Sequence, residues 1–351
     1  FLAIKKEMEP TLLLPLGFGT ILVNIPNADA ALETVIGGIT HRGPLLTLFD
    51  AGIANELFPL ILFIGIGAMI DFGPLLSNPK LMLFGAAAQF GIFFTLCTSS
   101  MFFDINDAAS VAVIGAADGP TSIVVAQALN SKYLGAIMVA AYSYMALVPI
   151  IQPPIIRLLT TKKERLIRMP YEQKTVSKRT RILFPIVITV VVAAVVPASS
   201  SLIGFLMFGN LIRECGVLNS LSETAQKVLA NLVTIFLGIT IASQMKAESF
   251  LRPATLLILA LGLVAFIFDT AGGVLFAKFL NLFLRKKVNP MIGAAGISAF
   301  PMSSRVVANM ALKEDPSNFI LMQATSANVA GQLGSIVAGG MVITLISMML
   351  G

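Results

Sequence analysis

Long apolar stretches separated by short polar segments follow one another along the whole chain. About ten to eleven of them approach the roughly 20 residues that an α-helix needs to cross a bilayer. They lie at 10–25, 55–75, 80–100, 108–128, 133–158, 181–197, 201–213, 226–246, 253–284, 289–312 and 317–349, of which the last is long enough to contain a break. This pattern predicts an all-α polytopic membrane protein.

Two of these stretches are interrupted in the middle by glycine, proline and polar residues. The first interruption reads GAADGPTS (115–122), and the second reads NPMIGAAGISAFPMSSR (289–305). Glycine and proline disturb the helical hydrogen-bond ladder, and lipid offers no partner to the freed amides and carbonyls. Such breaks persist at membrane depth only where protein buries them or where they line a watery cavity. A pair of breaks at matching places predicts an ion or substrate site near the bilayer midplane.

The segments around each break are similar in the two halves of the chain. The aligned pairs are GAAD (115–118) with GAAG (293–296), VVAQALN (124–130) with VVANMAL (306–312), and Tyr144 with Asn328. We therefore predict two membrane repeats, 1–156 and 182–351, joined by a loop at 157–181. Each repeat has one discontinuous helix, and we expect the inverted arrangement of sodium/proton-antiporter-like transporters, because inverted repeats recur in ion transporters.

Composition and charge support this class. Of the 351 residues, 56% are hydrophobic and 12% are charged, whereas soluble domains carry about 25% charged residues. The 157–181 loop holds nine of the 24 Lys and Arg residues, and the positive-inside rule places it in the cytoplasm. Nucleic-acid binding is the other use of such a run, but the flanking spans favour the topogenic role. A second basic cluster at 285–287 fits the same side.

Several other kinds of site are disfavoured. The two cysteines, Cys97 and Cys215, have no metal-ligand spacing and are expected to be free buried thiols. His41 is the single histidine, and no phosphate-binding loop or dinucleotide fingerprint is present. The chain begins FLAIKK, partway through an apolar stretch, so we expect its first helix to be incomplete.

Asp118, inside the first break, is the strongest candidate for ion binding. An aspartate at bilayer depth costs about 2.5–3.5 kcal/mol on insertion scales, so it needs a partner or a function. Na⁺ prefers carboxylate, hydroxyl, amide and backbone carbonyl oxygens. The side chains of these kinds around the two breaks are Asp118, Thr121, Ser122, Asn289, Ser298 and Asn328. Capping of a half-helix is the structural alternative for Asp118, and both roles are compatible.

Three further polar residues stand in apolar surroundings. Arg305, close to the second break, is expected to be buried there, where it could neutralise Asp118 or bind a carboxylate in bidentate fashion; snorkelling to the interface is the alternative. Tyr144 could supply a phenolic oxygen or proton, or belong to an interfacial aromatic belt. Asp269 has no counterpart in the other repeat, so we expect a structural or partner contact.

The motifs carrying these residues resemble those of a known family. GAADGPTSI, NPMIGAAGISAFPMSSRV and SANVAGQLGSIVAGG are similar to signature segments of the β subunit of the sodium-pumping biotin-dependent decarboxylases, which act on oxaloacetate, methylmalonyl-CoA or glutaconyl-CoA. The resemblance extends over essentially the whole chain. It implies a membrane subunit of the bacterial inner membrane that removes CO₂ from carboxybiotin, consumes a proton and moves Na⁺ out of the cytoplasm.

The same resemblance implies roles for individual residues and partners. The expected Na⁺ site combines Asp118, Asn289, Asn328 and Gly293 with Thr121 and Ser122, the hydroxyl donors that the residues themselves suggest beside Asp118. The residues expected to act in decarboxylation are Tyr144, Ser298 and Arg305, of which Ser298 and Arg305 also contact carboxybiotin. The expected partners are an α carboxyltransferase with its biotin carrier and a small γ membrane subunit, with a homo-oligomer left open.

One alternative function remains open from the residues alone. Paired breaks and a repeat are equally compatible with a stand-alone Na⁺/H⁺ antiporter or a Na⁺-coupled carboxylate transporter. Biotin and decarboxylation are implied by the resemblance only, because no spacing in this chain indicates a carboxyl group.

Overall fold

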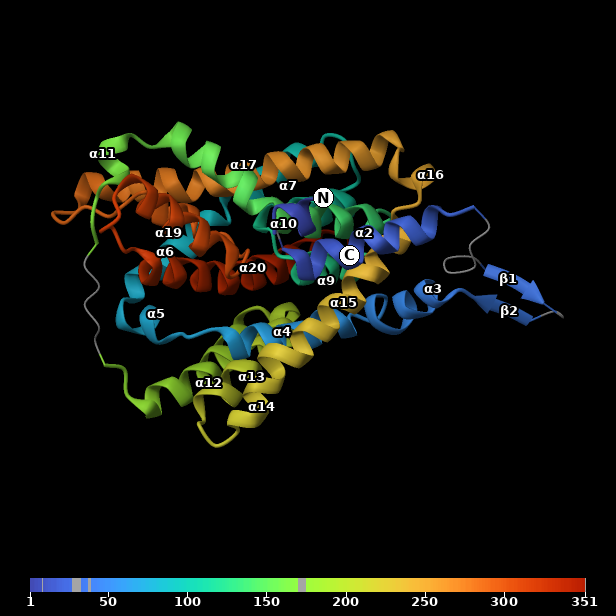
Figure 1. Cartoon of the computed structure of the whole chain (residues 1–351), viewed down its shortest axis with the longest axis horizontal. Coiled ribbons are helices and arrows are strands. Elements are labelled where there is room, and N and C mark those ends of the chain that lie inside the picture. Colours follow the sequence, from blue (N-terminus) through green and yellow to red (C-terminus); the bar gives the residue numbers. More distant parts are fainter. Residues whose placement is uncertain (8, 27–32, 37–38, 170–174, 351) are drawn as a thin grey trace.

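The computed structural model describes residues 1–7, 9–26, 33–36, 39–169 and 175–350. Within these ranges the only sheet is a two-stranded antiparallel hairpin, β1 (Glu33–Ile36) and β2 (Ile39–Arg42), which projects away from the helices (Figure 1). The helices are α1 (Leu2–Lys5), α2 (Pro10–Asn24), α3 (Pro44–Leu48), α4 (Leu57–Met69), α5 (Gly73–Ser77), α6 (Met82–Ala88), α7 (Phe90–Ser99), α8 (Ile105–Ala112), α9 (Gly119–Ala128), α10 (Leu134–Leu159), α11 (Lys162–Arg165), α12 (Lys178–Val195), α13 (Ser200–Glu214), α14 (Asn219–Glu223), α15 (Ala230–Ile241), α16 (Ala247–Phe250), α17 (Pro253–Phe283), α18 (Met291–Ala294), α19 (Met302–Glu314) and α20 (Leu321–Leu350).

Short 3₁₀- and π-helical turns extend several of these helices. They are η2 (Phe49–Ile53), η3 (Pro79–Leu81), η4 (Val113–Ala116), η5 (Pro197–Ser199), η6 (Thr224–Leu229) and η7 (Ala242–Gln244). The architecture confirms the predicted all-α polytopic class.

Fewer helices span a membrane unbroken than the apolar pattern suggested. Among the described residues, five helical stretches are long and apolar enough to cross a bilayer, and a sixth is formed if a pair bent by 64° counts as one span. The five are Pro79–Ser99, Leu134–Leu159, Asn219–Gln244, Pro253–Phe283 and Leu321–Met349. The predicted segments at 108–128 and 289–312 are divided by the two breaks. By contrast, α20 is continuous, so the last apolar stretch contains no break.

The helices pack in two groups. One, the α4/α13 group, consists of α2, α4, α12, α13 and α15. Of these, α4, α12 and α13 occupy the lower part of Figure 1 with α14. The other, the α17/α20 group, consists of α6, α7, α10, α17 and α20 and carries the broken helices. The α4–α13 contact is close because both helices present glycine: a Cβ at Gly67 would lie 1.8 Å from the Leu206 carbonyl oxygen. Small residues let membrane helices approach in this way.

Ion pairs attach the basic loop to one end of the α17/α20 group. The loop segment at α11 is tied to neighbouring helices by Arg165–Glu314 (2.8 Å), Arg168–Asp315 (2.7 Å) and Lys278–Glu164 (3.2 Å). Hydrogen bonds from Ser317, together with the Arg168 guanidinium, lower the pKa of Asp315 to about 2, so this anchor stays charged near neutral pH. Residues 170–174 of the predicted loop lie outside the described residues.

Candidate functional site

The two breaks meet in the interior of the protein. In the first, η4 ends at Ala116, the next residue, Ala117, has a left-handed φ of 53°, and Asp118 then caps α9. In the second, the chain leaves α18 at Ala295 and becomes helical again only at Met302. The amide and hydroxyl of Ser298 both donate to the Ala116 carbonyl oxygen, at 3.1 and 2.7 Å. Ser298 of the second break therefore provides hydrogen-bond donors to a carbonyl oxygen of the first break, which lipid could not provide.

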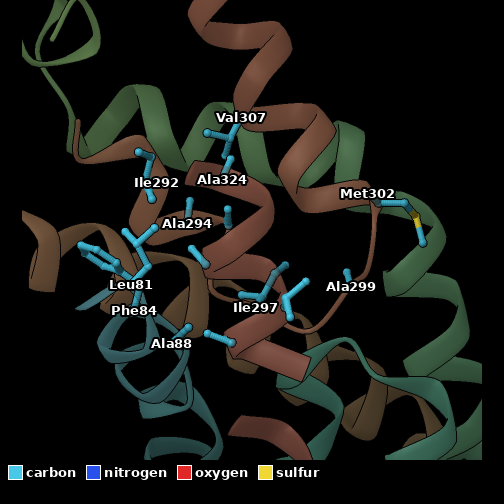
Figure 2. Close-up of a cluster of buried hydrophobic side chains, with 14 of the residues drawn as sticks. Leu81, Phe84, Ala88, Ile292, Ala294, Ile297, Ala299, Met302, Val307 and Ala324 are labelled. Atoms are coloured by element: carbon cyan, nitrogen blue, oxygen red, sulfur yellow. The ribbon is translucent and has the colours of Figure 1, made fainter. Parts of the chain in front are cut away.

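Apolar side chains surround the second break and hold it in place. Leu81, at the end of η3, and Phe84 of α6 lie near Ile292 and Ala294 of α18 (Figure 2). Ala88 of α6 lies near Ile297, in the segment of the second break that has no helical structure. A Cβ at Gly296 would lie 2.4 Å from the Phe84 carbonyl oxygen. The glycine therefore allows the backbone of the break to rest directly on α6.

Asp118 is buried, and hydrogen-bond donors hold one of its carboxylate oxygens. Its side chain is 2% exposed. Oδ2 accepts from the Thr121 hydroxyl at 2.7 Å, the Ser335 hydroxyl at 2.8 Å and the Gln332 amide at 2.9 Å. Oδ1 has only the backbone amide of Thr121, at 3.4 Å. The donors suit an ionised carboxylate, and Oδ1 retains capacity for another partner.

Gln332 and Ser335 were not among the predicted site residues. They follow Asn328 on α20 with spacings of four and three residues, which places all three on one face of the helix. This face turns toward the first break, because two of its members bond Asp118. Polar residues recurring at helical spacing in an apolar span were the signal that could have identified them.

Asn328 carries the most informative unpaired atom of the site. Its side-chain amide donates to the Ile297 carbonyl oxygen in the second break, at 2.6 Å. Its Oδ1 is buried and has no hydrogen-bond partner. A buried acceptor without a donor is costly, and a small hard cation satisfies such an oxygen. The donor set of Asp118 and Asn328 therefore fits Na⁺.

A cavity of about 260 Å³ reaches this region, and its lining includes Asp118, Ser298, Gln332 and Arg305. The expectation that Arg305 is buried is wrong, because its side chain is exposed at this cavity. Arg305 lies in the first turn of α19, where it points away from the packed side of the helix. Among the described residues it forms no ion pair within 4 Å, although its charge acts on Glu9, which also lines the cavity.

Two predicted residues lie against other parts of the chain. The Asn289 side-chain amide donates to the carbonyl oxygens of Arg165 and Ile167, both at 2.9 Å, and its Oδ1 accepts from the Met291 amide. Asn289 thus ties the basic loop to the start of the second break. The Tyr144 hydroxyl donates to the Leu259 carbonyl oxygen of α17. These bonds direct both side chains away from Asp118.

Two other predicted residues act mainly through the backbone. A Cβ at Gly293 would lie 1.9 Å from the Gly273 carbonyl oxygen, so this glycine permits contact between α18 and α17. The Ser122 hydroxyl donates to the carbonyl oxygen of Asp118 at 2.9 Å, inside the first turn of α9. Thr121, by contrast, contacts the Asp118 carboxylate directly.

We expect Gln332→Leu to weaken Na⁺ binding by about 10-fold or more, because outer hydrogen-bond partners of ion ligands typically contribute 10–100-fold in affinity. Leucine has a similar volume and removes the bond to Asp118. The measurement is the Na⁺ concentration at half-saturation of the purified protein. Gln323→Leu is the matched control, since Gln323 is also on α20 but bonds the Met169 carbonyl oxygen. An equal Na⁺ dependence of the two variants would contradict the assignment.

Comparison with known proteins gives a consistent result over the whole chain. Residues 1–346 match the family described as the Na⁺-transporting oxaloacetate decarboxylase beta subunit. The chain is 48% identical to the methylmalonyl-CoA decarboxylase subunit beta of Propionigenium modestum, over 98% of this chain and 91% of the relative. It is 45% identical to the oxaloacetate decarboxylase beta chain of Klebsiella pneumoniae, over 98% of this chain and 92% of the relative. With breaks, buried aspartate and full-length similarity in agreement, this chain belongs to the family of Na⁺-transporting decarboxylase β subunits.

Proposed function

We propose that this subunit couples decarboxylation of carboxybiotin, with consumption of a proton, to outward transport of Na⁺. The observation that carries the proposal is the pair of available buried oxygens at the meeting of the two breaks, Oδ1 of Asp118 and Oδ1 of Asn328. Membership of a decarboxylase family favours this function over a stand-alone Na⁺/H⁺ antiporter or carboxylate transporter.

In this proposal Na⁺ is the transported substrate, and Asp118 and Asn328 are its direct side-chain ligands. Thr121 orients the Asp118 carboxylate through its hydroxyl, and Ser122 stabilises the turn that presents it. Asn289 and Gly293 contribute by positioning the second break. Their contacts with the basic loop and with α17 support this indirect role better than direct coordination.

The side chains at the cavity suit a carboxylated cofactor carried by another subunit. Biotin would supply a transferable carboxyl group. Arg305 is exposed at the cavity and has a guanidinium free of close ion pairs among the described residues, so it can bind a carboxylate in bidentate geometry. Ser298 lines the same cavity and can donate a hydrogen bond once its bond to Ala116 is exchanged. Tyr144 stabilises α17 beside the first break and enters the proton path only if its bond to Leu259 opens.

Coupling requires that decarboxylation and Na⁺ occupancy bias the same two-state element. The joined breaks are that element, because Ser298 of one break bonds Ala116 of the other while Asp118 follows two residues later. A group that engages Ser298 from the cavity weakens the bond between the breaks. The resulting movement changes the spacing between Asp118 and Asn328, which lie on different elements.

The helix contacts support the proposed division into two repeats, 1–156 and 182–351, for which we propose the inverted arrangement. The α4–α13 contact has a counterpart in α15–α2, with the halves exchanged, and α10–α9 has a counterpart in α20–α19. Each broken helix also contacts the long helix of the other half, as α10–α19 and α20–α9. In this arrangement the 157–181 loop is cytoplasmic, at the end where the carboxyltransferase and biotin-carrier subunits and the γ subunit of a bacterial inner-membrane complex would bind.

Inverted membrane vesicles test the whole proposal. We expect the assembled complex to accumulate Na⁺ when the decarboxylation substrate is added, and we expect avidin to abolish this uptake by trapping biotin. Avidin saturated beforehand with free biotin is the matched control and should leave uptake unchanged. Substrate-driven Na⁺ uptake that survives free avidin would rule out biotin as the energy carrier.

A further inference from the structure

We infer that Asp269 is a second ion-binding residue, which carries a proton against the part of the first break that precedes Asp118. Asp269 lies near the middle of α17 and is 0% exposed. Neither of its carboxyl oxygens has a hydrogen-bond partner. An isolated ionised carboxylate in such surroundings is very costly, and the group normally becomes neutral by binding a cation or a proton.

The surroundings of Asp269 favour a proton over a larger cation. A Cβ at Gly115 would lie 2.7 Å from Oδ2, and a Cβ at Gly91 would lie 2.5 Å from Oδ1. The carboxyl group is therefore packed between the backbone of η4 and the first turn of α7. A proton occupies no additional volume there, whereas Na⁺ would need several oxygen ligands around it.

No described charged group is placed to neutralise Asp269. The adjacent elements α6, α7, η4 and α18 contain no Asp, Glu, Lys, Arg or His, and Cys97 of α7 is exposed. The other titratable groups on or packed along α17 have separate environments: Asp107 bonds Ser131, Tyr144 bonds Leu259, Tyr142 lies against Gly119, Lys278 pairs with Glu164, and Arg157 and Glu248 are exposed. A countercharge for the ionised form is therefore absent from the described neighbourhood.

The carboxyl groups of Asp118 and Asp269 differ in their hydrogen bonds. Asp118 receives hydrogen bonds from three side chains and one backbone amide, all of which stabilise an ionised carboxylate. Asp269 receives none, so nothing among the described residues stabilises its ionised form in the same way.

The position of Asp269 links this proton to the breaks. α17 contacts the first break at Gly115 and, one turn farther along, the second break through Gly273 and Gly293. Gly115, against which Asp269 packs, is three residues from Asp118 in the same break. Two negative charges held near one another inside a protein repel each other. Na⁺ at Asp118 should therefore favour release of the Asp269 proton, a coupling that rests on the proposed Na⁺ site.

Infrared spectroscopy of the purified complex in Na⁺-free buffer tests proton occupancy directly. We expect the wild type at neutral pH to show the carbonyl band of a protonated carboxyl group, and we expect Asp269→Asn to lose it. Thr270→Val, a substitution at the neighbouring buried residue, should retain the band. A band that persists in Asp269→Asn would overturn the inference. So would its absence from the wild type, which would mean that Asp269 is ionised and holds a metal cation.

A second measurement separates this inference from the proposed function. Addition of Na⁺ should diminish the band in the wild type and leave it unchanged in Asp118→Asn. If the band is present but insensitive to Na⁺, the coupling is refuted while the proton site stands. If Asp269→Asn does not fold, ¹³C-labelling of aspartate in the wild type replaces it: the band must shift, and an unshifted band would refute the assignment to aspartate.

Discussion

Asp118→Asn is expected to abolish Na⁺-dependent decarboxylation and Na⁺ uptake by the assembled complex. Asparagine has nearly the same shape and caps a helix as well as aspartate does, so α9 should still form. What disappears is the negative charge that binds the cation. Loss of an outer partner of an ion ligand already reduces affinity by about 10–100-fold, and loss of the charged ligand should exceed about 100-fold.

Folding and Na⁺-dependent activity should both be measured for Asp118→Asn and for a control variant. Asp104→Asn is the matched control, because Asp104 is exposed and forms only a surface pair with Lys132 at 3.1 Å. Surface pairs contribute about 0–1 kcal/mol, so this variant should retain activity. If Asp118→Asn folds and also retains Na⁺-dependent activity, Asp118 is a helix cap and the ion-binding role is refuted.

Gly293→Ala is expected to lower the thermal stability of the complex and to reduce decarboxylation at least about 10-fold. The added methyl carbon would lie 1.9 Å from the Gly273 carbonyl oxygen and 2.4 Å from the Gly273 carbonyl carbon. Both are backbone atoms of α17, so no side chain can rotate to relieve the overlap. Overpacking of this kind typically costs about 1–3 kcal/mol of stability. It should also displace the second break from its contact with α17.

Thermal unfolding with and without Na⁺ distinguishes packing from coordination. We expect the decrease in melting temperature to be the same in Na⁺-free and Na⁺-saturated samples, because Gly293 acts through contact with α17. Gly204→Ala is the control: a Cβ there meets nothing within 4 Å, so alanine in the α13 helix should be neutral or slightly stabilising. A stability loss in Gly293→Ala that appears only with Na⁺ would instead support direct coordination by the Gly293 backbone.

The sequence alone determined the class of this protein and predicted where its chemistry is located. Spans of apolar residues predicted the helical membrane fold, and two clusters of glycine and proline predicted both breaks, because no other arrangement of such residues satisfies the backbone in lipid. Asp118 stood out for a similarly local reason: an aspartate inside such a break is too costly without a partner or a function. The motifs around it were sufficient to indicate the family.

Only the tertiary structure decided which side chains reach Asp118. Gln332 and Ser335 do, whereas Asn289 and Tyr144 bond elsewhere and Arg305 is exposed. The direction of a side chain depends on how its helix is rotated about its own axis. For α20 that rotation is fixed by contacts between residues distant in sequence: a Cβ at Gly331 would lie 2.0 Å from the Gly296 carbonyl oxygen, so α20 can face the second break only along this glycine surface.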